Sequence, residues 1–73
     1  MNYFKFSLAL NNFNEQSVEI ITAFLFQLGF ESCEESNNNI YAYTKKVNLT
    51  DDLINEMETL SKNHNFKFTF NEI

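Results

Sequence analysis

Apolar and polar residues alternate at the start of the chain. Every second residue from Phe4 to Leu10 is a large apolar one, and the positions around them carry Tyr3, Lys5, Ser7 and Ala9. A period of two residues places successive side chains on opposite faces of a strand. The pattern therefore predicts a half-buried β-strand over residues 3–10.

The pattern then changes to intervals of three and four residues, which is typical of a helix. The apolar residues of this segment are Val18, Ile21, Phe24, Leu25 and Leu28. They fall within roughly one third of the helical circumference, so we expect them to face a sheet. Asn14 is the expected N-cap, and Gly29 is the expected stop. Ile20 and Phe26 lie on the flanks of the stripe, and we interpret them mainly as core packing, with partial exposure of Phe26 toward a partner as the alternative.

The middle of the chain predicts a hairpin. Residues 30–35 and 40–46 have the composition of two short strands, and residues 36–39 between them are rich in Asn. Asn tolerates the left-handed backbone conformations that tight turns use. The two strands are therefore expected to form a β-hairpin whose turn contains no glycine.

A second helix and a last strand complete the pattern. Thr50 is an expected N-cap, the stripe Leu53, Met57 and Leu60 follows it, and the helix should end near residues 63–65. Phe66, Phe68 and Phe70 then alternate with polar residues, which predicts a strand with an aromatic inner face.

The predicted order is strand, helix, strand, strand, helix, strand. Two right-handed crossovers built from this order give an α+β fold, the ferredoxin-like βαββαβ sandwich, in which a four-stranded antiparallel sheet carries two helices on one face. Residues 1–73 are too few for more than one such core, so we expect a single domain.

Charge and composition narrow the classes of partner. The net charge is −5 and the pI is about 4.6, which opposes attraction to nucleic acid and to anionic membranes and favours a basic protein partner. One Gly and no Pro leave no Gly-rich nucleotide loop. One cysteine and the absence of a long apolar run favour a cytoplasmic protein.

Residues that often carry chemistry have structural interpretations here. His64 is the only histidine and falls at a predicted helix end, where it complements the helix dipole. Cys33 has no adjacent cysteine or base. Glu31, Glu34 and Glu35 are better explained as a solvated strand edge than as a catalytic pair or metal ligands, although they can attract a basic partner. We therefore expect no catalytic, metal or cofactor site in this chain.

The open face of the predicted sheet is the candidate contact surface. Residues expected to point away from the helices are Tyr3, Lys5, Tyr41, Tyr43, Lys67 and Thr69. Aromatic and cationic side chains on such a face also occur in RNA-binding sheets, but the RNA-binding signature is missing and the chain is acidic. Ordinary strand propensity is a third explanation. The candidate partner-binding residues are Tyr3, Lys5, Tyr41, Tyr43 and Phe26.

Five segments carry a family resemblance. They are the opening strand at residues 2–6, the helix end at residues 25–29, Gly-Phe-Glu-Ser at residues 29–32, Tyr-Ala-Tyr at residues 41–43 and the closing residues 71–73. In order and spacing the chain resembles the amino-terminal domain of the bacterial methyltransferase that modifies ribosomal protein L-eleven, particularly its Bacteroidetes-type members. It departs from that pattern in its Asn-rich turn and a short second helical region.

The resemblance implies a substrate-recognition domain with the ferredoxin-like fold. It also implies a basic ribosomal protein as the partner. The catalytic domain, which would bind S-adenosylmethionine and transfer methyl groups, would be a separate one, and this chain would be an amino-terminal fragment that cannot methylate alone. No functional residue is carried over from the family, because its chemistry lies outside the part that this chain resembles.

Two other functions remain open from the sequence. A freestanding ferredoxin-like regulatory domain would dimerise and bind a small metabolite between its subunits. An independent enzyme is disfavoured because no nucleophile and base are recognisably arranged. Between a monomer and an oligomer, the sequence slightly favours the monomer.

Overall fold

The structure is a computed structural model that describes residues 2–73. Its elements along the chain are β1 (Tyr3–Leu10), α1 (Glu15–Gln27), β2 (Ser32–Ser36), β3 (Asn39–Lys45), a 3-10 turn η1 (Lys46–Asn48), α2 (Asp51–His64) and β4 (Phe66–Glu72). The predicted order of strands and helices is confirmed, and the predicted bounds of β1 are those observed.

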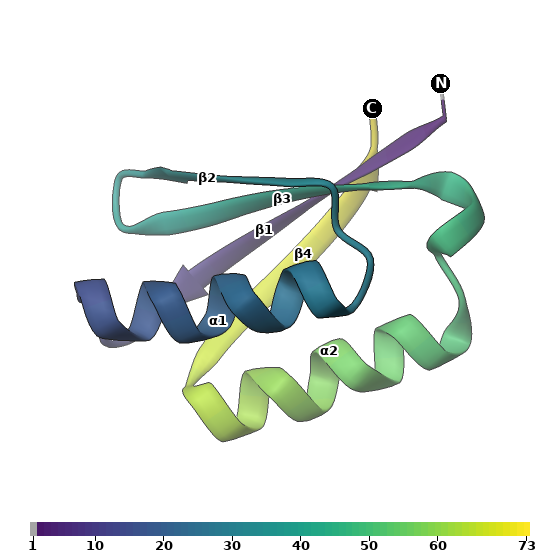
Figure 1. Cartoon of the computed structure of the whole chain (residues 1–73). Coiled ribbons are helices and arrows are strands. Elements are labelled where there is room, and N and C mark those ends of the chain that lie inside the picture. Colours follow the sequence, from purple (N-terminus) through teal and green to yellow (C-terminus); the bar gives the residue numbers. More distant parts are fainter. Residues whose placement is uncertain (1) are drawn as a thin grey trace.

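The four strands form one antiparallel sheet in the order β2-β3-β1-β4. Both helices lie on the same side of it (Figure 1). This is the predicted ferredoxin-like α+β sandwich. The two central strands, β1 and β3, are covered by the helices on one face and leave the other face open, whereas β2 and β4 form the two edges.

The core lies between the sheet and the helices. Its fully buried apolar residues are Phe6 and Leu8 of β1, Ile21 and Leu25 of α1, Ile40 and Ala42 of β3, and Met57 of α2. The Phe6 ring meets Phe30 edge-on at 5.1 Å and stacks on Phe70 at 4.9 Å between centroids. The inward positions predicted by alternation are thus confirmed, although Phe70, on the β4 edge, stays 41% exposed.

Polar caps define the ends of both helices. The Asn14 side chain accepts from the Ser17 amide at 2.9 Å, and the Thr50 hydroxyl accepts from the Leu53 amide at 3.1 Å. Gly29 follows α1 with φ of +101°, a conformation that glycine adopts without steric penalty. The Gly29 and Phe30 amides donate back to the Phe26 and Leu25 carbonyls, which closes a Schellman motif.

The orientation of Phe24 differs from the prediction. We expected it to face the sheet with Val18, Ile21 and Leu25, but it is 40% exposed, and its ring lies 5.6 Å from that of His64 on α2. The other three are buried and set the contact direction, and Phe24 lies roughly 90° around the helix from their centre. It therefore packs at the flank, beside α2.

The hairpin and α2 also differ from the prediction in their bounds. Strand β2 begins at Ser32, because the Phe30 amide completes the helix cap and the Glu31 amide bonds to the Tyr43 carbonyl ahead of the regular ladder. Asn37 and Asn38 form the turn with φ of 52° and 66°. Helix α2 has 14 residues against 13 in α1, so the second helical region is not short.

Candidate protein-docking surfaces

Four of the five predicted contact residues share the open face of the sheet. Tyr3 and Lys5 come from β1, and Tyr41 and Tyr43 come from the neighbouring β3, with Lys5 directly opposite Tyr43. Lys5 Nζ lies 4.6 Å from the centroid of the Tyr41 ring, which is within the range of a cation–π contact. The two central strands therefore present one aromatic and cationic surface, the tyrosine face.

Two of these tyrosines are held by glutamates. The Tyr3 hydroxyl donates to Glu31 Oε1 at 2.8 Å, and the Tyr43 hydroxyl donates to Glu34 Oε1 at 3.0 Å. The accepting carboxylate favours the protonated phenol, so it raises the pKa of both Tyr3 and Tyr43 above the usual tyrosine value. Their hydroxyl groups are consequently occupied within the chain, and the rings remain available for contact.

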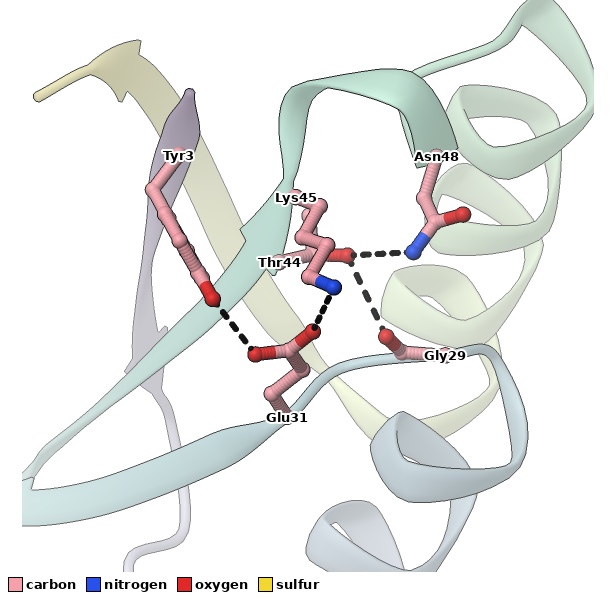
Figure 2. Close-up of polar contacts among 6 residues, drawn as sticks. All are labelled: Tyr3, Gly29, Glu31, Thr44, Lys45 and Asn48. Carbon is pink, nitrogen blue, oxygen red and sulfur yellow. Dashed lines mark hydrogen bonds and ion pairs between the residues drawn. The ribbon is translucent and has the colours of Figure 1, made fainter. Parts of the chain in front are cut away.

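A polar cluster fixes the connection between α1 and β2 (Figure 2). The buried Thr44 hydroxyl donates to the Gly29 carbonyl at 3.2 Å and accepts from Asn48 Nδ2 at 3.3 Å. Glu31 binds Tyr3, as above, and also lies 3.6 Å from Lys45 Nζ. Phe30 between them is buried against Phe6. Every residue from Gly29 to Glu31 thus has a structural role.

Phe26 does not belong to the tyrosine face. It is 50% exposed on α1, on the opposite side of the sheet, beside the edge strand β2. It lines a groove of about 430 Å³ between α1 and β2. The apolar lining includes Val18, Ala23 and Cys33, and the polar lining includes Glu19 and Glu35. The five predicted contact residues therefore form two surfaces, which we call the tyrosine face and the α1–β2 groove.

The negative charge is unevenly distributed over the two layers. Helices α1 and α2 carry six carboxylates, at residues 15, 19, 51, 52, 56 and 58, and a single lysine, Lys62. By strand register the open face carries Lys5, Lys45 and Lys67 and is joined by two glutamates, Glu31 and Glu34. The attraction for a basic partner that the net charge predicts thus arises from the helix side and from β2, and not from the tyrosine face.

The three glutamates near the hairpin do not converge. Glu31 and Glu34 each hold a tyrosine, while Glu35 pairs with Ile40 in register and points to the helix side. Burial raises the pKa of the Cys33 thiol to about 11, which makes it a poor nucleophile at neutral pH. In the described residues 2–73, no three His, Cys, Asp or Glu side chains gather as metal ligands, and no helix is long and apolar enough to cross a membrane.

The sequence favoured core packing for Phe26 and kept exposure toward a partner as the alternative, but the side chain is half exposed. The groove beside it was not predicted. The groove depends on which strand forms the edge and on how α1 lies over it, and neither follows from periodicity. A signal was present in the acidic residues Glu19 and Glu35, which flank apolar positions on both elements.

Comparisons with known proteins found no matching family model, no matching curated protein and no matching solved structure. The resemblance to the methyltransferase domain therefore stays a prediction from the sequence.

Proposed function

We propose that this chain is the substrate-recognition domain of an S-adenosylmethionine-dependent methyltransferase that modifies ribosomal protein L-eleven. Its task is to dock the basic substrate so that a separate catalytic domain can reach the amines to be methylated. The support is the sequence resemblance together with the ferredoxin-like fold that the resemblance implies and the structure has.

The observation that carries the proposal is the acidic surface formed by the two helices and β2. Carboxylates of the helices and of β2 face solvent, where they attract a basic protein and orient its approach. Tethering such a domain to an enzyme raises the local concentration of substrate, so even weak docking increases the rate of methylation. We place this activity in the cytoplasm, where ribosomal proteins are made.

The residues of this chain do not fit the methyl donor. A dinucleotide-type or adenosyl-binding loop joins a strand to a helix through several glycines. Gly29 is the single glycine, and it follows a helix and precedes a strand. No chemical step is therefore assigned to this chain, and in the proposal its role is recognition alone.

The test is a titration of the isotope-labelled chain with ribosomal protein L-eleven, followed by NMR. We expect saturable shifts with a dissociation constant below about 1 mM, weakening as salt screens the charges. An unrelated basic protein of similar net charge serves as the control. If L-eleven causes no shifts at about 1 mM, or binds no better than the control, the proposed function is wrong.

A further inference from the structure

We infer that the free edge of β2, together with the α1–β2 groove, binds an extended basic segment of a partner protein as an added antiparallel strand. The inference deepens the proposed function, because it rests on a basic protein partner and names the surface and the conformation in which that partner binds.

The edge of β2 offers backbone groups for such pairing. In the register, Ser36 faces Asn39 across the two-residue turn, and the pairs then run to Ser32 opposite Tyr43. Hydrogen-bonded and non-bonded pairs alternate from the turn, so the amides and carbonyls of Cys33 and Glu35 point out of the sheet. Within residues 2–73 no further strand covers this edge. An extended peptide can bond to both residues.

The groove supplies a place for side chains of the added strand. Residues opposite Cys33 and Glu35 would point to the helix side, where Phe26, Ala23 and Val18 offer apolar contact. The intervening residues would point to the open face, beside Glu34. A segment that alternates between apolar and basic residues therefore matches this site.

Charge selects a basic segment over a second copy of this chain. In a symmetric antiparallel pair of β2 strands centred on their middle residue, each Glu34 would lie opposite its counterpart, with Glu35 close by. Like charges directly opposite destabilise a strand pair. Lysines of the alternating segment would instead point to the open face beside Glu34, and the nearby carboxylates of Glu35 and Glu19 add to the attraction at longer range.

Another hollow on the molecule fits a basic partner less well. It lies near the chain ends and is lined by Asn2, Tyr3, Lys45, Lys46 and Val47. Its two lysines are paired with Glu31 and Glu72 at 3.6 Å and 3.1 Å, so the charge of these carboxylates is already balanced within the chain. The α1–β2 groove combines apolar lining, carboxylates and unpaired backbone.

The experiment uses an acetylated peptide of about seven residues in which lysine and valine alternate, titrated into the labelled chain. We expect amide shifts at Ser32–Ser36 and along the groove side of α1. A peptide with glutamate in place of lysine should cause none. The absence of shifts with the lysine peptide at about 5 mM, or shifts centred on α2 or β4, would overturn the inference.

Backbone pairing has its own test in the peptide. In antiparallel addition, the valines in the groove direct their amides to β2, and the lysines direct theirs to solvent. N-methylation of the valines should therefore reduce affinity about tenfold or more, and N-methylation of the lysines should reduce it much less. Undiminished binding of the valine-methylated peptide would contradict strand addition.

Two phenylalanines of α1 provide matched variants. Phe26→Ala removes a groove contact and should weaken peptide binding about fivefold to tenfold. Phe24→Ala removes a similarly exposed ring that lies over His64, and it should leave binding unchanged. Glu35→Lys should weaken binding by a similar factor through charge. Equal effects of Phe24→Ala and Phe26→Ala would place the peptide elsewhere.

Titration with L-eleven separates this inference from the proposed function. Shifts in β2 that are lost with Phe26→Ala support both. Binding of L-eleven that leaves β2 unperturbed overturns the groove as the docking site and leaves the proposed function standing. Peptide binding at β2 without L-eleven binding overturns the proposed function and retains the groove as a site for another basic segment.

Discussion

At the residue scale, one buried hydroxyl joins three parts of the chain. Thr44 is fully buried on β3, and its hydroxyl links the Gly29 carbonyl after α1 to the Asn48 side chain in η1. A buried polar group is tolerated when its hydrogen bonds are made, and it destabilises the fold when a partner is removed. Thr44 therefore positions the start of β2 as well as filling space.

Replacing this hydroxyl by a methyl group tests that role. Thr44→Val keeps the shape of the side chain but leaves the Gly29 carbonyl without its donor, and we expect a loss of about 1–2 kcal/mol in the free energy of unfolding by urea. Thr69→Val, the same change at an exposed position on β4, should alter stability by less than about 0.5 kcal/mol. Equal effects at the two positions would show that the buried hydrogen bonds contribute nothing.

At the scale of elements, short-range signals account for most of what the sequence predicted. Strand β1 and both N-caps follow from alternation and from Asn14 and Thr50, because these signals are local in the chain. The predicted start of β2 is two residues too early, because the Phe30 amide bonds to the end of α1. The pattern of apolar residues does not reveal this hydrogen bond. The exposure of Phe24 was missed because it depends on where α2 lies.

The Asn37–Asn38 turn gives a prediction for the hairpin. Both residues have positive φ, as a two-residue hairpin turn requires, and glycine is preferred at its second position. In urea unfolding, Asn38→Gly should therefore raise the free energy of unfolding slightly, by a few tenths of a kcal/mol, and Asn38→Val should lower it by about 1 kcal/mol or more. If valine is tolerated as well as glycine, the turn does not have the backbone conformation described.

At the scale of the whole molecule, the helix layer and the open face of the sheet differ in charge. The sequence predicted the sandwich and its two faces, and the structure confirms both. The basic partner stays a prediction, and periodicity did not separate the predicted contact residues into two surfaces. The separation of charge between the helices and the open face appears only when strand register places each lysine. The α1–β2 groove likewise exists only in the folded arrangement.

Stability of the whole chain should fall at alkaline pH. The pKa values of Tyr3 and Tyr43 are raised on folding, and so is that of Cys33, to about 11. Because the folded pKa values are raised, these three groups lose their protons at a lower pH in the unfolded chain than in the folded one. Their contribution to the free energy of unfolding is therefore complete below the unfolded pKa values and is lost as pH rises through the folded ones. For the thiol the loss begins near pH 9, and for the phenols near pH 10.

The measurement is the urea midpoint between about pH 8 and pH 11. In a Cys33→Ala background, only the tyrosine contribution of these three groups remains. Adding Tyr3→Phe and Tyr43→Phe should then flatten the alkaline decline. If the decline is unchanged by these substitutions, the hydrogen bonds to Glu31 and Glu34 do not influence ionisation in solution.

The antiparallel pairing of β1 with β4 brings the beginning and the end of the described chain side by side. Phe4 faces Glu72 in register, and the Ile73 amide donates to the Tyr3 carbonyl at 3.0 Å. The backbone is thus nearly a closed ring, which a short peptide linker can complete and which can be reopened at the exposed Asn37–Asn38 turn. Such a circular permutant would keep the β1–β4 seam as an internal hairpin and release β2 and β3 as its two termini, making the proposed docking strand the last segment of the polypeptide.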